Sequence, residues 1–161
     1  MRITYREALE TDIESITQIY NDSIKIFPPS IRKDSEMELF VDFFNNNSVI
    51  IAENIEKSET IGWIAYNIKK DYTFIAGLYV KFSEQKKGTG TKLLDYCIKT
   101  LNKNNCKLVI LHALKIAPWS IGFYGKNNFL IYEIDNNYEE DLNCIKSRKI
   151  NNWEKLMYRK I

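Results

Sequence analysis

The stretch Gln85-Lys86-Lys87-Gly88-Thr89-Gly90 lies between two apolar segments of different periodicity. Before it, residues 74–80 are rich in branched and aromatic side chains, which is typical of a β-strand. After it, apolar residues recur at helical spacing between Thr91 and Leu101, which predicts an amphipathic helix. Glycines let the backbone turn tightly between two such elements. The sequence therefore predicts a strand, a glycine loop and a helix in succession.

The glycine loop has the properties of an anion site. The first N–H groups of a helix have no partner inside the helix and attract negative charge, and Lys86 and Lys87 add positive charge beside them. Two well-known phosphate motifs do not fit. The loop has no Gly-Lys pair for a P-loop, and Leu93 occupies the place of the third glycine in a dinucleotide fingerprint. Taken alone, the loop is also compatible with a solvated helix start that binds nothing.

Composition restricts the class of protein. The chain has 161 residues, 45% of them hydrophobic and 27% charged, which predicts one compact domain over residues 1–161. A net charge of +2 is too small to indicate a nucleic-acid partner. No apolar run approaches the ~18 residues of a membrane span, and the first residues do not resemble a secretion signal. The cysteines, Cys97, Cys106 and Cys144, are odd in number and irregularly spaced, so we expect no disulfide framework, no metal site and a cytoplasmic location.

Strand and helix patterns alternate along the rest of the chain. Strands are expected at residues 3–6, 49–53, 60–68, 74–80, 107–114, 129–134 and 154–160, and helices at 13–24, 34–44, 91–101 and 119–126. The capping-box pattern Thr11-Asp12-Ile13-Glu14 marks the first helix start. Short connections predict antiparallel neighbours before residue 80, and a strand–helix–strand order predicts a parallel pair of residues 74–80 with 107–114. The segment 27–33 is either a pocket cover or a surface turn, and the long segment 135–150 is of the kind that is often functional.

Three motifs in order resemble a known family. Residues 77–80, Gly-Leu-Tyr-Val, are followed after four residues by Gln85-x-x-Gly88-x-Gly90, which resembles the acyl-CoA-binding motif of the GCN5-related N-acetyltransferase (GNAT) superfamily. Residues 121–129, Ile-Gly-Phe-Tyr-Gly-Lys-Asn-Asn-Phe, resemble its second signature, in which a Phe-Tyr pair precedes a Gly-Phe pair. The N-terminal spacing of that family is matched by Arg6, Ala8, Asp12 and Ile16. Together the motifs cover the chain from Ile3 to Ile134.

The resemblance implies an α/β (α+β) fold with a mixed, mostly antiparallel sheet of six to seven strands and about four flanking helices. The sheet would splay between its fourth and fifth strands, with acyl-CoA in the gap. The diphosphate would lie on main-chain N–H groups of the loop, and the pantetheine would pair with the strand before it. The implied cofactor-binding residues are Leu78, Tyr79, Val80, Gln85, Lys86, Lys87, Gly88, Thr89, Gly90 and Thr91.

The implied activity is transfer of an acetyl group from acetyl-CoA to a primary amine by direct attack on the thioester. Tyr124 matches the family's general acid, which protonates the leaving thiolate, although a packing role is the alternative. His112, the only histidine, lies twelve residues earlier, where some members carry a glutamate base. An imidazole can accept a proton at neutral pH, but a structural role in an apolar strand fits His112 equally well. Glu53 is a second, weaker candidate for the base.

The chain departs from the family pattern at three positions. Ala117 stands where the family commonly has Asn, so that a cofactor hydrogen bond is either lost or supplied by Ser120. Asn128 replaces the usual Gly, which is a mild change because Asn tolerates left-handed geometry. Phe82 stands where proline is common. None of the three lies within the glycine loop.

The acceptor is not encoded in these motifs. A small-molecule amine or a peptide or protein N-terminus fits equally well, and the resemblance implies that it would enter near the first two helices and segment 135–150. A homodimer is compatible with the sequence, whereas no nucleic acid, membrane or metal is expected to take part. The alternative to an enzyme is a non-catalytic acyl-CoA-binding sensor or interaction module on the same fold. Nucleotide binding by the same loop is a third hypothesis.

Overall fold

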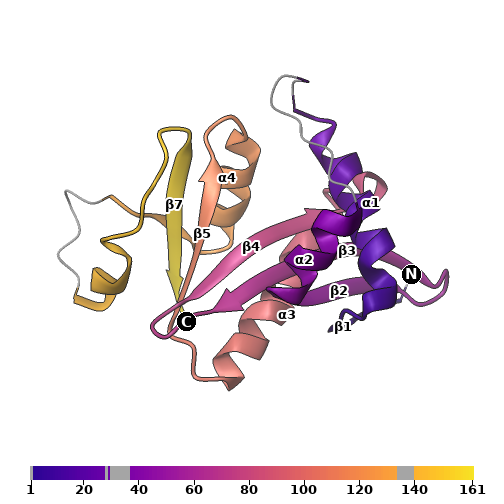
Figure 1. Cartoon of the computed structure of the whole chain (residues 1–161), viewed down its shortest axis with the longest axis horizontal. Coiled ribbons are helices and arrows are strands. Elements are labelled where there is room, and N and C mark those ends of the chain that lie inside the picture. The colour runs from indigo at the N-terminus through magenta and orange to yellow at the C-terminus, as the bar shows by residue number, and fades with distance from the viewer. Residues whose placement is uncertain (1, 28, 30–36, 134–139) are drawn as a thin grey trace. The chain divides into compact units, whose positions relative to one another are not determined.

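The computed structural model describes residues 2–27, 29, 37–133 and 140–161. In these residues the chain forms seven strands and four α-helices in the expected order (Figure 1). They are β1 Ile3–Glu7, α1 Ile13–Ile24, α2 Met37–Asn45, β2 Ser48–Asn54, β3 Glu59–Ile68, β4 Thr73–Val80, α3 Thr89–Lys103, β5 Leu108–Leu114, α4 Pro118–Lys126, β6 Leu130–Ile131 and β7 Glu154–Lys160. Short 3₁₀ helices add η1 Glu10–Asp12, η2 Phe82–Glu84 and η4 Glu140–Ile145.

The strands form one mixed sheet in the order β1-β2-β3-β4-β5-β7-β6. The pairs β1–β2, β2–β3, β5–β7 and β6–β7 are antiparallel, whereas β4 and β5 run parallel. The register of the parallel pair covers three positions, from Thr73↔Val109 to Ile75↔Leu111. Both strands continue beyond it, to Val80 and Leu114. The predicted mixed sheet that splits between its fourth and fifth strands is therefore confirmed.

The chain divides into two compact units. The first consists of Met1–Asn67 and Ala76–Thr100, and the second of Ile68–Ile75 and Leu101–Ile161. The two ends of β4 thus belong to different units. The expectation of a single domain over residues 1–161 stays a prediction.

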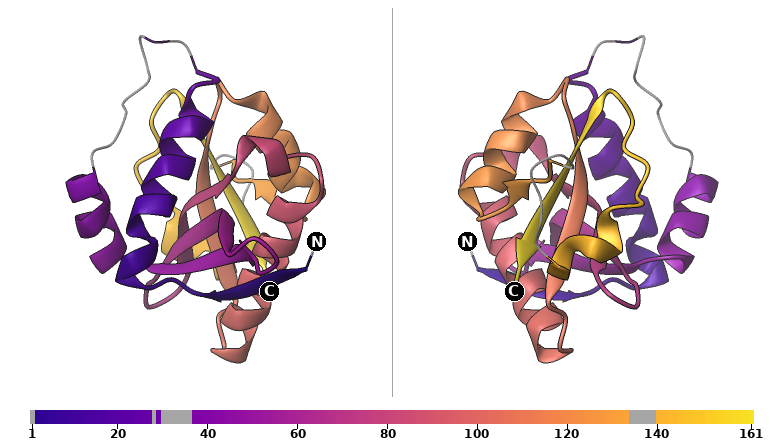
Figure 2. Two further views of the ribbon diagram at one scale, coloured as in Figure 1. Left: turned by 90° about the vertical axis from the view of Figure 1, so that its right-hand side faces the viewer. Right: turned by 90° about the vertical axis from the view of Figure 1, so that its left-hand side faces the viewer.

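The core of the first unit lies between α1, α2 and the face of the strands that they cover (Figure 1). Helix α1 contributes a stripe of isoleucines, and the strands contribute residues of one parity; together they are Ile13, Ile16, Ile19, Phe40, Val49, Ile51, Trp63 and Ala65. Trp63 is 1% exposed, and its indole N–H donates to the Ile16 carbonyl at 3.0 Å. Helix α3 covers the opposite face (Figure 2), where Leu93, Leu94 and Cys97 are fully buried.

The core of the second unit forms on one face of β5 and β7. Leu108 and Ile110 of β5 pack with Leu156 and Tyr158 of β7, beneath Leu142 and Ile145 of η4. Helix α4 lies on the other side of these strands from η4 (Figure 2). Four consecutive residues of β5, Leu108 to Leu111, are buried. This confirms the expectation that a near-continuous apolar strand is covered on both faces.

The first helix is not capped as predicted. Asp12 is the residue before α1, but its side chain makes no cap hydrogen bond. Instead its carboxylate accepts two hydrogen bonds from Arg6, at 2.7 and 3.0 Å, and one from the Leu9 N–H at 2.7 Å. A charged partner and an earlier N–H group compete successfully for the carboxylate, so the capping box expected at Thr11–Glu14 is wrong.

Two expected segments also differ. The strand predicted at residues 129–134 is reduced to Leu130–Ile131 among the described residues, and the predicted loop 135–150 contains the turn η4. Residue 28 and residues 30–36 and 134–139, which carry most of the predicted connector 27–33, the predicted start of the second helix and part of segment 135–150, lie outside the described residues. Of the helices that the structure describes, none combines the length and the apolar character that a bilayer crossing requires.

Candidate functional site

The glycine loop has an unusual backbone. It leaves η2 at Gln85 in extended geometry, passes through the left-handed region at Lys86 (φ 59°) and again at Gly88 (φ 83°), and enters α3 at Thr89. A Cβ atom at Gly88 would meet no other atom within 4 Å, so glycine is needed there for its φ and not for space. Left-handed residues next to right-handed ones turn successive N–H groups toward one point, which makes a concave anion site.

The start of α3 adds free donors to this loop. Its first intrahelical bond runs from the Lys92 N–H to the Gly88 carbonyl at 3.0 Å, so the N–H groups of Thr89, Gly90 and Thr91 precede the helical ladder. Thr89 is only 2% exposed, and its buried side chain fixes the first residue of the helix. A helix of this length presents a partial positive charge at this end. The loop is therefore suited to a phosphate, as the sequence predicts.

Two polar side chains of the loop, those of Gln85 and Lys87, contact the protein itself. The Gln85 side-chain amide donates to the Val80 carbonyl at 3.1 Å, which ties the loop to the end of β4. Lys87 Nζ lies 3.3 Å from Glu84 Oε1. Gln85 thus has a structural task that its sequence pattern does not reveal. This leaves the main-chain N–H groups of Thr89, Gly90 and Thr91 as the donors of the predicted anion site.

Close packing around the end of β4 requires glycine at two positions. A Cβ atom at Gly77 would collide with the ring of Tyr79 at 2.9 Å and would press on Trp63 at 3.3 Å. A Cβ atom at Gly62 of β3 would lie 3.0 Å from the Tyr79 carbonyl oxygen. Burial, with a smaller contribution from nearby Tyr20, raises the pKa of the Tyr79 hydroxyl well above its usual range, so this phenol stays neutral at physiological pH.

Tyr124 lies on α4 in the second unit and is buried. Its ring packs edge-on against Phe123, with centroids 5.1 Å apart, and against Phe129, with centroids 5.5 Å apart. After α4 the chain turns at Asn128 with φ 65°, and the Phe129 N–H donates to the Tyr124 carbonyl at 3.0 Å. The expectation that Asn128 replaces glycine in a left-handed position is confirmed. Ala117 precedes α4, is 3% exposed and provides no side-chain cap.

His112 lies on β5 in the second unit, on the opposite face from Tyr124. It shares the face of Leu108 and Ile110, which is covered by η4, because side chains two residues apart on a strand point the same way. Helix α4, which carries Tyr124, lies on the other side of β5 and β7 (Figure 2). The His112 ring packs edge-on against Phe74, with centroids 5.6 Å apart. The two predicted catalytic residues therefore come from elements on opposite sides of β5 and β7.

Two residues near His112, Glu154 and Asn151, were not predicted from the sequence. Glu154 Oε2 lies 3.2 Å from His112 Nδ1, and it accepts hydrogen bonds from the Asn151 main-chain and side-chain nitrogens at 3.3 and 2.9 Å. Glu154 is 42 residues from His112 in sequence, and no local pattern joins them. The only available signal was a single acidic residue at the start of the strand expected at residues 154–160. Glu53, the second candidate base, is held by Arg6 Nε at 3.1 Å.

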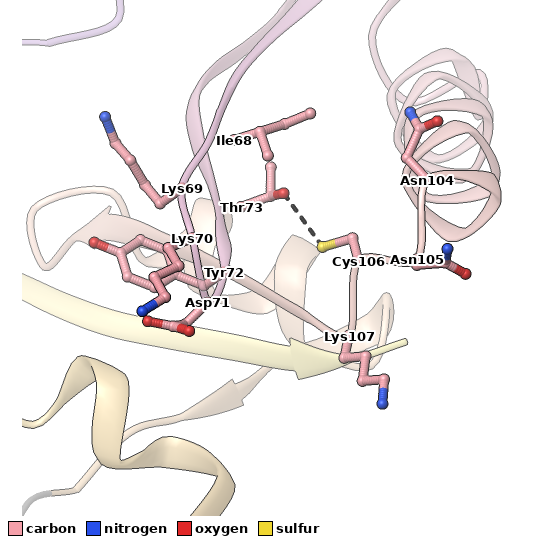
Figure 3. A pocket seen from close by; sticks show the side chains of 10 residues that line it. All are labelled: Ile68, Lys69, Lys70, Asp71, Tyr72, Thr73, Asn104, Asn105, Cys106 and Lys107. Atoms are coloured by element: carbon pink, nitrogen blue, oxygen red, sulfur yellow. Dashed lines mark hydrogen bonds between the residues drawn. The ribbon is translucent and has the colours of Figure 1, made fainter.

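A second cavity of about 330 Å³ lies within the second unit and contains none of the predicted site residues. It is lined by two turns, at residues 68–73 and 104–107 (Figure 3). Its thiol, Cys106 Sγ, is 3.2 Å from Thr73 Oγ1 and donates to the Leu108 carbonyl at 3.4 Å. These contacts satisfy the polar groups at its centre. In the part of the chain that the structure describes, no cluster of His, Cys, Asp and Glu is arranged to hold a metal ion.

Solved structures share this architecture over the whole chain. PaiA N-acetyltransferase from Thermoplasma acidophilum in complex with coenzyme A superposes with a TM-score of 0.79 at 19% identity, covering 100% of both chains. Ribosomal-protein-S18-alanine N-acetyltransferase from Escherichia coli gives 0.74 at 16% identity, covering 99% of this chain and 94% of that one. Ard1 from Thermoplasma volcanium gives 0.73 at 20% identity, covering 100% and 99%. These identities show a common fold.

Sequence comparison identifies the family. No curated protein matches this sequence. The model of the acetyltransferase (GNAT) family matches residues 14–129, which are most of the chain and include the glycine loop, His112 and Tyr124. With the split sheet and the left-handed loop before α3, this match shows that the chain belongs to the GNAT family of acetyltransferases.

Proposed function

We propose that the protein transfers an acetyl group from acetyl-CoA to a primary amine by direct attack on the thioester. The observation that carries the proposal is the loop of residues 85–91, with left-handed backbone at Lys86 and Gly88 ahead of the free N–H groups of α3. A diphosphate accepts hydrogen bonds from such converging N–H groups. PaiA, which shares this fold, was crystallised with coenzyme A.

The chemistry assigns a task to each candidate residue. An alkylamine with a pKa near ~10.4 is mostly charged at neutral pH, so it must lose a proton before its nitrogen attacks the carbonyl carbon. His112 accepts that proton. The main-chain N–H of Leu78 or Tyr79 stabilises the oxyanion that forms with the new C–N bond. As the C–S bond breaks, the Tyr124 hydroxyl gives its proton to the leaving thiolate.

The residues present fit these tasks in two respects. Tyr124 is buried and its ring is fixed by Phe123 and Phe129, which suits a group that must meet one sulfur atom. The parallel register of β4 with β5 ends at Ile75, ahead of residues 78–80, as suits a backbone that pairs with a ligand instead. Names of structural neighbours include a ribosomal-protein alanine N-acetyltransferase, so we include N-termini among the acceptors of this chain.

A screen of amines tests the proposal. Purified protein and acetyl-CoA are incubated with a polyamine, amino acids, an aminoglycoside and N-terminal peptides, while CoA thiol release and the acetylated product are followed together. We expect stoichiometric thiol and product with at least one acceptor class. The alternative, an acyl-CoA-binding sensor or interaction module, predicts binding of acetyl-CoA with no thiol release above the hydrolysis background for any acceptor.

A further inference from the structure

The environment of His112 determines which of its two ring nitrogens carries a proton. Glu154 Oε2 lies 3.2 Å from His112 Nδ1, and it accepts hydrogen bonds from the Asn151 side-chain amide at 2.9 Å and the Asn151 main-chain N–H at 3.3 Å. The two contacts from Asn151 are donors, which makes this oxygen an acceptor. A carboxylate has no proton to give, so Nδ1 must carry the hydrogen of the third contact.

The other nitrogen is left without a partner. His112 Nε2 is buried and finds no hydrogen-bond partner among the residues that the structure describes. A buried N–H without an acceptor costs about 1 to 3 kcal/mol, whereas a bare nitrogen leaves only a lone pair unsatisfied. Both ends of the ring therefore favour the same neutral tautomer, with hydrogen on Nδ1 and a lone pair on Nε2.

Contacts within residues 151–154 hold Glu154 in place independently of His112. The Glu154 N–H donates to the Asn151 carbonyl at 2.9 Å, so residues 151–154 form a closed turn at the start of β7. The side chains of both His112 and Glu154 are 15% exposed, which limits competition from water. Among the described residues, Glu154 contacts the ring, and Arg148 lies beyond Phe74, with its guanidinium 4.7 Å from the Phe74 ring centroid.

We propose that Glu154 is a positioning residue that fixes His112 in the Nδ1–H tautomer and so makes Nε2 the nitrogen that accepts the proton of the amine. When the amine N–H proton moves to Nε2, the imidazolium that forms is stabilised by the Glu154 carboxylate at Nδ1. The same division of tasks between a base and a carboxylate operates in Ser-His-Asp triads. The catalytic part of this inference rests on the proposed function, whereas the tautomer does not.

The tautomer is measured first. Because the chain has a single histidine, a long-range ¹H–¹⁵N correlation spectrum of the ¹⁵N-labelled protein reports His112 alone. At a pH where the ring is neutral, we expect a protonated Nδ1 and a bare Nε2. In Glu154→Gln the preference should be lost or reversed, since an amide can also donate to Nδ1. A wild-type ring protonated at Nε2, or an unchanged tautomer in Glu154→Gln, overturns the proposal.

Kinetics separate the inference from the proposed function. Glu154→Gln should lower kcat for acetyl transfer by at least about 10²-fold, within the range for loss of general base catalysis, with little change in the KM for acetyl-CoA. Asn151→Ala, which loosens Glu154, should show a smaller change in the same direction. Glu56→Gln, in the exposed turn between β2 and β3, is the matched control and should keep wild-type kcat and tautomer.

The remaining outcomes are distinct. A tautomer change in Glu154→Gln with unaltered kcat overturns the positioning role, while acetyl transfer itself stands. If the wild-type protein acetylates no amine, the proposed function fails, and the spectrum still decides whether Glu154 fixes the tautomer. A structural contribution of Glu154 alone would lower stability without moving the histidine signals between tautomers, and circular dichroism with urea unfolding measures that contribution.

Discussion

At the scale of single residues, the structure shows the hydrogen-bond partners of residues for which the sequence predicted only a place in the site. Gln85 belongs to the signature of the loop, yet its amide binds the Val80 carbonyl of its own chain. His112 lies in an apolar strand, yet it faces a carboxylate from another strand. In both cases the residue type was predicted and the partner was not. Partners that come from distant segments leave no trace in local spacing.

Tyr124→Phe tests the proposed acid with the loss of one oxygen atom. The variant keeps the ring contacts with Phe123 and Phe129, so we expect an intact fold. Turnover should fall by about 10²- to 10⁴-fold, with little change in the KM for acetyl-CoA, because only the proton for the thiolate is lost. Initial rates of thiol release measure both constants.

Tyr132→Phe is the matched control for this experiment. Tyr132 is also buried in the second unit, and its hydroxyl has no hydrogen-bond partner among the described residues. Removal of an unpaired buried hydroxyl is expected to leave turnover unchanged and stability equal or slightly higher. Wild-type turnover in Tyr124→Phe, or an equal loss in both variants, would contradict the assignment of Tyr124 as the acid.

At the scale of elements, regular periodicity decides what can be predicted. The long helix α3 was recognised because its 3.6-residue repeat extends over enough positions. The turns η1, η2 and η4 were missed because three to six residues are too few for a repeat. Leu142 and Ile145 of η4 are buried because they pack against β5 and β7, and a local sequence pattern does not contain such tertiary contacts.

Asp12 links β1 to the start of α1, and the link depends on pH. Burial alone would raise the pKa of Asp12, but hydrogen bonds from Arg6 and the Leu9 N–H outweigh it and lower this pKa below its usual value. A lowered pKa in the folded state gives stability that is present above the ordinary carboxyl range, about pH 4, and is lost as the pH falls through the folded value.

Asp12→Asn should therefore destabilise the protein at pH 7 and much less near pH 3. We expect a loss of roughly 1 to 2 kcal/mol at pH 7, since the Arg6 side chain is 36% exposed and solvent screens part of the interaction. Urea unfolding at both values measures it. Asp22→Asn, which removes an exposed pair with Lys25 on the same helix, should cost less than about 0.5 kcal/mol. Equal losses for the two variants at pH 7 would refute the role of Asp12.

Gly88→Ala tests the loop as an element. At φ 83° an alanine is strained by about 1 to 2 kcal/mol, while its methyl group would meet no neighbour within 4 Å. If the loop relaxes toward ordinary φ, its N–H groups no longer converge, and the KM for acetyl-CoA should rise about 5- to 30-fold. Isothermal titration with CoA measures the same loss as a change in Kd.

The control for this prediction lies at the other end of α3. Asn105 is also left-handed, with φ 58°, and Asn105→Ala introduces comparable strain without touching the loop. It should lower stability and leave the Kd for CoA unchanged. A Kd that is identical in Gly88→Ala and the wild-type protein would remove the left-handed loop from the binding site.

At the scale of the whole molecule, the fold class was predicted from three short motifs. The order of elements, the parallel pair β4–β5 and the split beyond Ile75 agree with the resemblance. What remained hidden was the division of β4 between two compact units and the pairing that brings Glu154 to His112. These depend on contacts between segments far apart in sequence, for which a single chain offers no signal.

Ligand binding should stabilise the native protein in a way that separates the two phosphate hypotheses. CoA at a hundred times its Kd adds about 2.7 kcal/mol to the free energy of unfolding, because it binds only the folded chain. A thermal-shift series should therefore show a larger rise in Tm with CoA or acetyl-CoA than with ATP at equal concentration. A larger rise with ATP would instead favour nucleotide binding by the glycine loop.

The three tryptophans differ so much in exposure that their intrinsic fluorescence can be separated by quenching. Trp63 is 1% exposed in the core of the first unit, whereas Trp119 and Trp153 of the second unit are 51% and 62% exposed. An aqueous quencher such as iodide would suppress emission from the exposed pair and leave that of Trp63. The remaining fluorescence would then report the seating of α1 on β3 alone, through the indole that binds the Ile16 carbonyl.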